Sequence, residues 1–232
     1  MSKGQIMVDA LDTVARFTVN SVSVPTANPG GISAARVADL ILATIALLFL
    51  APLMVAIAVG IWVEDGGPAL YFQARIGRGG RMFRCLKFRS MAIHAEARLK
   101  ILLATDPAAR CEWDRDHKLK CDPRITRLGS FLRKSSLDEI PQLINVLRGE
   151  MTLVGPRPIV VSEVWRYRRY FKEYCSVRPG ITGLWQVNGR NDVSYRRRVA
   201  LDVAFSRSYS FKVYIAILIA TVPAVLLRKG SY

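Results

Sequence analysis

The chain has 232 residues, of which 34 are Lys or Arg and 18 are Asp or Glu, giving a formal net charge of +16. About half of the residues are hydrophobic, which excludes a disordered chain, and the length excludes a mini-protein that needs disulfides or metals to hold its core. Mean hydropathy is nevertheless slightly positive, at +0.19, which indicates an apolar membrane segment joined to a basic domain.

The first two segments in chain order differ sharply in polarity. Residues 1–32 are predicted to form a flexible tail, because 23–31 is rich in small, polar and helix-breaking residues. We expect 33–63 to form a membrane-inserted helix, since 40–63 carries no charge and about 20 apolar residues suffice to cross a bilayer core. This segment starts too far from residue 1 for a removable signal peptide, and it lacks a basic n-region and a cleavage site.

Pro52 lies near the middle of the apolar run. A proline inside a helix removes one backbone hydrogen bond, so we expect a kink there. Two geometries follow, a tilted helix that crosses the bilayer and a re-entrant helix that returns both ends to one side; composition does not choose between them. In both, the basic remainder belongs in the cytoplasm, next to anionic headgroups.

The basic domain, 64–232, opens with two predicted strands, 69–76 and 82–88, joined by a glycine-rich turn. The run from Arg75 to Arg89 has six basic residues and no acid, which suits either a solvated or lipid-facing surface or a wall that binds phosphate. Lys87 and Arg89 alternate with Phe88, so both cations should point to one side of the strand. Helix and linker are expected over about 93–120.

Two adjacent carboxylates, Asp138 and Glu139, are the clearest candidate site. Arg133 precedes them, and Pro141 predicts a helix that begins close by, because proline is tolerated in a first turn. Carboxylates beside cations and a helix N-terminus suit Mg²⁺ and phosphate chemistry, and the cations would keep Asp138 ionised.

The serines before this pair allow a simpler explanation of the same residues. Ser135 with Asp138, or Ser136 with Glu139, fits the capping box that begins many helices. The carboxylates would then serve as a plain helix cap.

Stiff turns display single arginines in the next stretch. Arg157 lies between two prolines in 155–158, and Arg178 opens the Pro/Gly turn 178–183. Gln186 and Arg190 follow in a glycine-bounded polar loop. Arginine is preferred where a planar fork reads phosphate, so we interpret these residues as a phosphate-binding set; a loop salt bridge is the alternative for each. A second apolar run, 213–227, is short for a span and predicts an interfacial or packed helix.

These motifs resemble those of the bacterial sugar transferase family, the monotopic phosphoglycosyl transferases that use polyprenyl phosphate. The matching stretches are KFRSM (87–91), SLDEIPQL (136–143), VGPRP (154–158), RPGITGLWQ (178–186) and NGR (188–190). Within the family, CLKFR (85–89), GRNDVSY (189–195) and RKGSY (228–232) are similar to members that begin exopolysaccharide repeat units with galactose phosphate or glucose phosphate.

The resemblance implies an α+β fold, with a mostly helical cytoplasmic catalytic domain (64–232) that has a small β-hairpin and interfacial helices. It also implies a kinked re-entrant helix in the bacterial inner membrane. One departure concerns the kink, where the family often has Ser-Pro and this chain has Ala51-Pro52. A serine can bond back to a helix carbonyl, so its absence bears on how sharply the helix bends.

The implied reaction transfers hexose-1-phosphate from a UDP-hexose to undecaprenyl phosphate, giving undecaprenyl-diphosphate-hexose and UMP. By the same resemblance, Asp138 attacks the β-phosphorus and holds a phosphosugar, while Glu139 assists the metal or the proton transfer and both carboxylates hold Mg²⁺. Direct attack by the lipid phosphate, with the carboxylates only as metal ligands, is the mechanistic alternative. The residues expected to bind phosphate are Lys87, Arg89, Arg133, Arg157, Arg178, Gln186 and Arg190.

The implied partners are the UDP-hexose, undecaprenyl phosphate and membrane lipids, with no nucleic acid; a homo-oligomer stays open. Two other functions also fit the charge. A membrane-tethered nucleic-acid binder would explain +16 but neither the carboxylate pair nor the arginine turns. A non-catalytic scaffold for polysaccharide assembly would leave polymer yield intact without Asp138.

Overall fold

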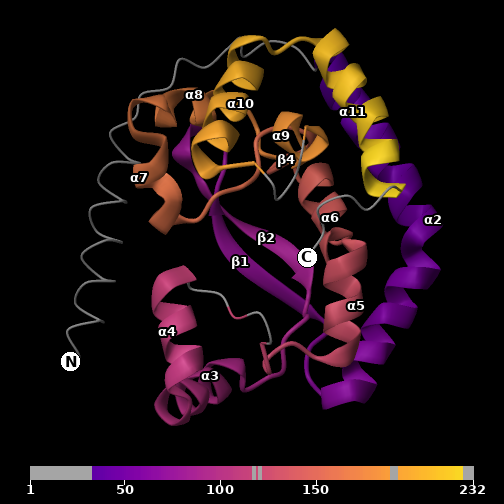
Figure 1. Cartoon of the computed structure of the whole chain (residues 1–232). Helices are drawn as coiled ribbons and strands as arrows, with labels where there is room; N and C mark the ends of the chain where they lie inside the picture. Colours follow the sequence, from indigo (N-terminus) through magenta and orange to yellow (C-terminus); the bar gives the residue numbers. More distant parts are fainter. Residues whose placement is uncertain (1–32, 117–118, 120–121, 189–192, 227–232) are drawn as a thin grey trace. The chain divides into compact units, whose positions relative to one another are not determined.

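The computed structural model describes residues 33–116, 119, 122–188 and 193–226 (Figure 1). The expected flexible tail, 1–32, lies outside them. Two compact units divide the chain: unit 1 takes its described residues from Met1–Phe49, Phe72–Leu86 and Gln142–Tyr232, and unit 2 from Leu50–Tyr71 and Lys87–Pro141. The described residues are mostly helical, as expected, and they form the predicted hairpin and a second small sheet that was not predicted.

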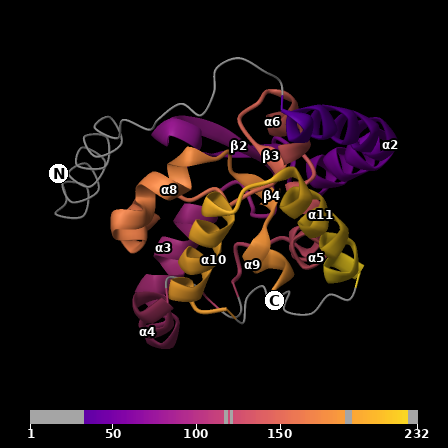
Figure 2. The same cartoon turned by 90° about the horizontal axis from the view of Figure 1, so that it is seen from above.

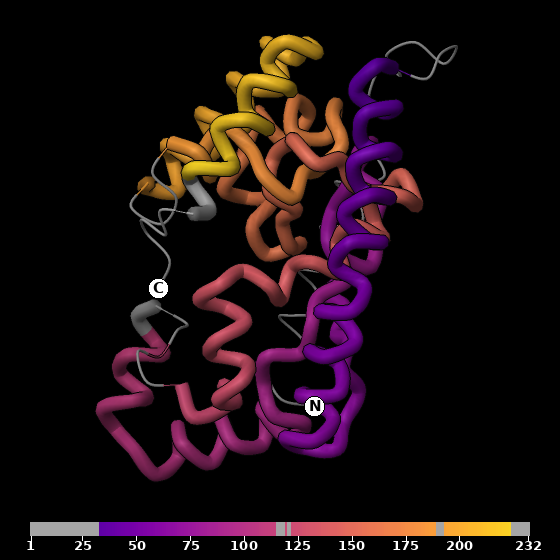
Figure 3. The backbone as a smooth tube through the Cα atoms, turned by 90° about the vertical axis from the view of Figure 1, so that its right-hand side faces the viewer, coloured from indigo at the N-terminus to yellow at the C-terminus, as the bar shows by residue number. Residues whose placement is uncertain are grey.

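The long helix α2 (Ala34–Asp65), the indigo helix of Figure 3, contains the whole apolar run. Pro52 lies inside this helix. Among the described residues it is the helix whose length and composition would allow it to cross a membrane, and only 11% of its most apolar window is buried. Large apolar side chains therefore face outward along its length, as in Phe49 and Val63. Its first part belongs to unit 1 and the rest to unit 2, so the kink at Pro52 stays a prediction.

The two predicted strands are confirmed as β1 (Leu70–Ile76) and β2 (Met82–Phe88), which form a two-stranded sheet. A short 3-10 turn, Arg78–Gly80, lies between them, and Gly79 and Gly80 have positive φ angles there. Glycine reaches that conformation at no steric cost, which is why the glycine-rich stretch can reverse the chain.

In unit 1, a buried carboxylate on α2 fastens the helix to later elements. One oxygen of Asp39, Oδ1, accepts hydrogen bonds from Thr152 Oγ1 (3.0 Å), Leu153 N (2.8 Å) and the Tyr214 hydroxyl (2.7 Å). One turn earlier, Arg36 donates to the carbonyls at the end of α6 (Gln142–Leu147). A buried charge is tolerated only with such partners, so these bonds fix how α2 enters unit 1.

The second sheet is a parallel pair, β3 (Thr152–Val154) and β4 (Gly180–Thr182), whose strands lie side by side in Figure 2. Thr152 pairs with Gly180 and Val154 with Thr182. A Cβ on Gly180 would clash with the backbone of Gly155, so glycine is required where the chains approach. The Gly180 amide also donates to the Pro156 carbonyl, so the turn that follows β3 folds back beside the start of β4.

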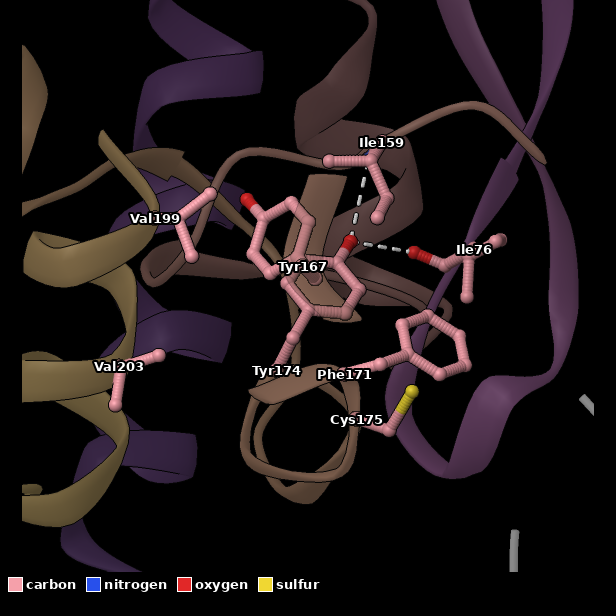
Figure 4. Close-up of a cluster of buried hydrophobic side chains, with 8 residues drawn as sticks. All are labelled: Ile76, Ile159, Tyr167, Phe171, Tyr174, Cys175, Val199 and Val203. Carbon is pink, nitrogen blue, oxygen red and sulfur yellow. Dashed lines mark hydrogen bonds between the residues drawn. The ribbon is translucent and has the colours of Figure 1, made fainter. Parts of the chain in front are cut away.

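The elements between and after these strands build the core of unit 1. They are α7 (Val164–Tyr167), α8 (Phe171–Ser176), α9 (Leu184–Val187), α10 (Tyr195–Arg207) and α11 (Phe211–Leu226). One buried cluster joins α8 and α10 to the ends of β1 and of the loop after β3 (Figure 4). On α11, Tyr214 and Ile217 are buried while Ile219 and Val222 are exposed, so this second apolar run is packed on one face.

Unit 2 is organised around the second part of α2 and helix α5 (Arg127–Ser135). Ile57 and Ile61 of α2 form a buried cluster with Phe88 and Leu132. The expected helix and linker over 93–120 are α3 (Ala95–Thr105) and α4 (Pro107–Asp116). Thr126 caps α5 by accepting a hydrogen bond from the Gly129 amide at 2.9 Å, which starts the helix that leads to the carboxylate pair.

Candidate active site

The carboxylate pair lies on a short 3-10 helix, Leu137–Glu139, directly after α5. Ser136, at the junction, has φ 58°, in the left-handed region. Its backbone amide donates to the Arg133 carbonyl and so closes the end of α5. Leu137 and Ile140, on either side of the carboxylates, both pack against the apolar cluster of α2 and α5. These two apolar anchors hold the intervening acidic residues in place.

The capping-box interpretation of the serines is wrong. The Ser136 side chain makes no capping bond, and the Ser135 hydroxyl donates back to the Phe131 carbonyl (2.7 Å) within α5. Ser136 adopts a left-handed conformation that ends α5 and leads directly into the 3-10 helix, with no hydrogen bond from its side chain to the first turn. The longer helix α6 starts only at Gln142, after Pro141. Asp138 and Glu139 therefore do not serve as a serine-paired cap.

Lys87, the penultimate residue of β2, meets both carboxylates. Its Nζ lies 2.6 Å from Glu139 Oε1 and 3.7 Å from Asp138 Oδ2. The three side chains are between 13% and 25% exposed, so they are largely removed from water yet reachable. A charge-assisted hydrogen bond of this length is strong in such surroundings. Among the residues predicted for the site, the structure thus brings Lys87, Asp138 and Glu139 together.

Burial sets the protonation chemistry of Asp138. Desolvation is the largest influence and raises the pKa of its carboxyl, because the charged form loses water. Lys87 pulls the pKa down, Glu139 pushes it up, and Arg133 again lowers it. The cations therefore oppose the effect of burial and favour the carboxylate, which is the form that can attack phosphorus or bind a metal.

Arg133 is oriented by Ser90, a residue for which the sequence predicted no such role. Its Nε donates to Ser90 Oγ at 2.8 Å, and Ser90 is buried. A Cβ on Gly129 would run into the Ser90 backbone, so α5 and the end of β2 are in close contact here. The hydrogen bond to Arg133 uses the hydroxyl of Ser90, a group that threonine also carries.

Arg89 forms an ion pair with Asp65 at the end of α2. The alternation predicts that Lys87 and Arg89 point to one side of the strand, and each engages its own carboxylate. A phosphate-binding role for Arg89 stays a prediction. To bind phosphate, the Arg89 guanidinium would have to leave Asp65 or contact Asp65 and the phosphate together.

In unit 1, the turn after β3 presents Arg157 as the sequence suggests. Arg157 is exposed, whereas Gly155, Pro156 and Pro158 around it are buried. The Gly155 amide donates to the Thr182 carbonyl and the Pro156 carbonyl accepts from Gly180, both at 2.8 Å. The backbone is held while the guanidinium reaches outward, which is the arrangement expected of an anion-binding arginine.

The other candidates in unit 1 differ in how far they are already engaged. Arg178 donates from Nε to the Gly149 carbonyl (3.0 Å), so part of its fork supports the fold. Burial lowers the pKa of this guanidinium, and the positive charges of Arg78 and Arg36 lower it further. The Gln186 amide donates to the Ile181 carbonyl at 3.5 Å, and within the described residues its buried Oε1 accepts no hydrogen bond. Arg190 lies outside the described residues.

Two supporting residues were missed as individuals, Ser90 and Arg75. Arg75 belongs to the basic run, but it is a structural arginine whose Nη1 donates to the Pro158 carbonyl at 3.0 Å. Ser90 follows Lys87 and Arg89 closely, and this adjacency was the available signal. Neither partner could be named from spacing, because the partners are 43 and 83 residues away.

The donor set fits Mg²⁺ better than a structural metal. The oxygens of Asp138 and Glu139 converge on one cation, Lys87, which shows that the pair can face a single positive charge. Within the described part of the chain no three His, Cys, Asp or Glu side chains gather as a metal site. Mg²⁺ commonly uses one or two carboxylates and fills its remaining positions with water and substrate phosphate.

Comparison with known proteins places this geometry in a family. The family model described as "Bacterial sugar transferase" matches residues 32–228. The chain is 50% identical over 197 residues to an undecaprenyl-phosphate galactose phosphotransferase of Salmonella typhimurium, covering 85% of this chain and 41% of that protein. It is 46% identical to the exopolysaccharide production protein ExoY of Sinorhizobium fredii, covering 88% of this chain and 89% of that one.

A third relative is a UDP-glucose:undecaprenyl-phosphate glucose-1-phosphate transferase of Xanthomonas campestris pv. campestris, 40% identical over 92% of this chain and 44% of that protein. The chain thus spans about two fifths of the length of several relatives and nearly all of ExoY. The match covers the carboxylate pair, Lys87 and the arginine turns. The chain belongs to the bacterial sugar transferase family.

Proposed function

We propose that the chain transfers hexose-1-phosphate, galactose or glucose, from a UDP-hexose to undecaprenyl phosphate, the first membrane step of exopolysaccharide synthesis. The observation that carries the proposal is the buried Asp138 beside Glu139 and Lys87 within the matched region. The Salmonella and Xanthomonas relatives are named for galactose and glucose phosphate transfer to undecaprenyl phosphate. The relative of nearly equal length is named for exopolysaccharide production.

In the first step, an Asp138 carboxylate oxygen attacks the β-phosphorus of the sugar nucleotide. The bond between that phosphorus and the oxygen bridging to the α-phosphate breaks, and UMP leaves with that oxygen. The product is a hexose phosphate joined to Asp138 as an acyl phosphate. Carboxylate nucleophiles of this kind divide one difficult displacement into two easier ones.

In the second step, a phosphate oxygen of undecaprenyl phosphate attacks the same phosphorus. The bond to Asp138 breaks, the carboxylate is restored, and undecaprenyl-diphosphate-hexose leaves. One phosphoanhydride is lost and one is made, so no further energy source is required. Glu139 lies next to Asp138 and can accept a proton from the acceptor phosphate when that phosphate arrives protonated.

Lys87 and Arg133 supply positive charge to this chemistry from unit 2. Displacement at phosphorus spreads negative charge over the equatorial oxygens, and fixed cations in a dry site stabilise that charge. Lys87 is already held by Glu139, and Arg133 is aimed by Ser90, so neither cation must be reorganised during the reaction. Arg157 is proposed to bind the phosphates of the donor.

We propose that Asp138 and Glu139 also hold Mg²⁺, which would shield the charges of the diphosphate when bound. If so, chelation with EDTA should reduce UMP release by at least about a hundredfold, and added Mg²⁺ should restore it. The measurement is UMP released from UDP-hexose in the presence of undecaprenyl phosphate. Full turnover in excess EDTA, after extensive dialysis against chelator, would contradict the metal.

We further propose that α2 is re-entrant in the bacterial inner membrane, with both of its ends and the catalytic residues on the cytoplasmic side. Its first turns are bonded to residues of unit 1 through Arg36 and Asp39. Near its other end, Ile57 and Ile61 pack against α5 and Glu64 accepts from the Leu128 amide. Both ends of α2 thus contact residues that follow the helix in the chain. If α2 crossed the bilayer, those residues would lie on one side of the membrane and the first end of α2 on the other.

Labelling tests this topology. Single cysteines are introduced at the exposed positions Ser33 and Pro68 in a variant whose native cysteines are replaced by serine. A membrane-impermeant maleimide is expected to label neither site in intact spheroplasts and both after lysis. Labelling of Ser33→Cys from outside would show a crossing helix and contradict the hairpin.

The function itself is tested with purified protein, Mg²⁺, undecaprenyl phosphate and a panel of UDP-sugars. Release of UMP together with a lipid-linked hexose diphosphate is the expected result, and the panel identifies the preferred sugar. A protein that binds anionic vesicles normally but releases no UMP from any donor would overturn the proposal.

A further inference from the structure

Hydrogen bonds hold the backbone on both sides of Arg157. On the first side, Gly155 and Pro156 are bonded to the β4 segment. On the second side, the Pro158 carbonyl accepts from Arg75, and the Ile159 carbonyl accepts from the Ile76 amide at 2.9 Å. The turn is therefore clamped at two ends around one exposed side chain.

A buried tyrosine hydroxyl completes the second clamp. The Ile159 amide donates to the Tyr174 hydroxyl (3.2 Å), and that hydroxyl donates to the Ile76 carbonyl (2.7 Å), as Figure 4 shows. In a regular antiparallel pair, the Ile159 amide would bond the Ile76 carbonyl directly. Tyr174, from α8, is inserted between them and is only 1% exposed. Its hydroxyl thereby sets the spacing between β1 and the segment that follows the Arg157 turn.

Arg75 forms the other half of this clamp. Its guanidinium donates to the Pro158 carbonyl and, from Nη2, to Gln73 Oε1 at 2.6 Å, and it lies 3.7 Å from Glu163 Oε2. The same Glu163 oxygen accepts from the Val160 amide at 3.0 Å. The Arg75 side chain is 13% exposed. Arg75 and Glu163 thus bind the Pro158 carbonyl and the Val160 amide, which lie just beyond Arg157.

We propose that Tyr174 and Arg75 are positioning residues that hold Arg157 against the diphosphate of the sugar-nucleotide donor. The inference rests on the proposed function, in which Arg157 binds that diphosphate. The buried Tyr174 hydroxyl and the nearly buried Arg75 guanidinium each carry a desolvation cost that their hydrogen bonds must offset. A direct bond from the Ile159 amide to the Ile76 carbonyl would have avoided the cost of the hydroxyl. These bonds fix the turn that carries Arg157. A binding site that is rigid before the ligand binds loses less conformational entropy on binding.

The test uses Tyr174→Phe, which keeps the ring packing and removes only the hydroxyl. We expect KM for the UDP-hexose to rise roughly five- to tenfold, about 1–1.4 kcal/mol of lost donor binding, with kcat at saturating donor and KM for undecaprenyl phosphate nearly unchanged. Tyr214→Phe is the matched control, because it also removes a fully buried hydroxyl in unit 1, one that bonds Asp39. It should lower the unfolding temperature similarly and leave the donor KM unchanged.

A second variant guards against a folding defect in the first. Arg75→Lys keeps the charge but lacks the fork that reaches Pro158, Gln73 and Glu163 together, so it should raise the donor KM in the same way. Equal rises in donor KM for Tyr174→Phe and Tyr214→Phe would overturn the proposal, since a merely structural effect would explain both.

Coupling to Arg157 decides the point. In an Arg157→Ala background, Tyr174→Phe should produce no further rise in donor KM, because the group that it positions is gone. The inference would be overturned if Tyr174→Phe raised the donor KM by the same factor with and without Arg157→Ala. It would also be overturned if Arg157→Ala alone left the donor KM unchanged. These outcomes leave the proposed function standing, which fails only if the unmodified protein releases no UMP.

Discussion

Replacing Asp138 with asparagine is expected to reduce UMP release by at least about a thousandfold, because the amide keeps the shape of the side chain but cannot displace UMP as a nucleophile. Intact-mass measurement of the unmodified protein with donor alone should show one added hexose phosphate, and Asp138→Asn should show none. Glu139→Gln is the matched control for a lost neighbouring charge and should still acquire the adduct, more slowly.

Two outcomes would contradict this account in different ways. Near-normal UMP release by Asp138→Asn would remove the carboxylate from the mechanism altogether. Absence of the adduct in an otherwise active, unmodified protein would reject the covalent route and favour direct attack by the lipid phosphate, with both carboxylates as metal ligands.

The same substitution should stabilise the fold. Burial raises the pKa of Asp138 above its unfolded value, so its ionised form is disfavoured by folding at neutral pH. Asparagine carries no such cost, and we expect a gain on the order of 1 kcal/mol at pH 7. At a pH below the pKa of Asp138 in the unfolded chain, this carboxyl is protonated in both the folded and the unfolded state. The difference in stability between Asp138→Asn and the unmodified protein should therefore vanish in acid. Thermal unfolding across pH measures this, and a loss of stability at pH 7 would contradict it.

Replacing Lys87 with methionine is the second large effect. Lys87 lowers the pKa of Asp138 and binds Glu139, so its loss leaves two adjacent, largely buried carboxylates without their shared cation. We expect at least about a hundredfold loss of kcat/KM at pH 7. The acid limb of the pH profile should move to higher pH, because the pKa of Asp138 rises further and ionisation then needs a more alkaline solution.

The matched control for Lys87→Met is Arg89→Met. Arg89 lies two residues away and pairs with Asp65, so its removal takes the same charge from the same strand end. It should leave the acid limb in place whatever it does to the rate. An acid limb that shifts equally in both variants would mean that general charge, and not contact with the carboxylates, sets the pKa.

Local patterns predicted the parts of this fold that depend on local physics. The alternation of residues in 82–88 and the glycines at 77–80 were sufficient to place β1 and β2, and an uncharged run was sufficient to place α2. Arg157 between two prolines was expected to reach outward from a stiff turn, and it does. In each case the determining interactions lie within a few residues of sequence.

Sequence patterns did not predict the contacts that depend on residues far apart in the chain. Ser135 and Ser136 match a capping box, but packing of Leu137 and Ile140 against α2 and α5 favours a left-handed turn that ends α5. The alternation of Lys87 and Arg89 did not predict their partners, which are Glu139 for Lys87 and Asp65 of α2 for Arg89. Ser90 and Arg75 look like ordinary members of their segments until the fold brings their partners to them.

The bonds of Asp39 have a consequence for biogenesis. Its three donors follow it by 113, 114 and 175 residues, so none has been synthesised when the apolar helix leaves the ribosome. If α2 inserts as proposed, the Asp39 carboxylate borders the hydrophobic segment before its partners exist and would have to stay hydrated at the bilayer surface, which would keep the start of the helix from moving deeper into lipid. The three donors are complete only when Tyr214 of α11 has been synthesised, so an α2 that inserts as proposed would enter the membrane before the fold is complete.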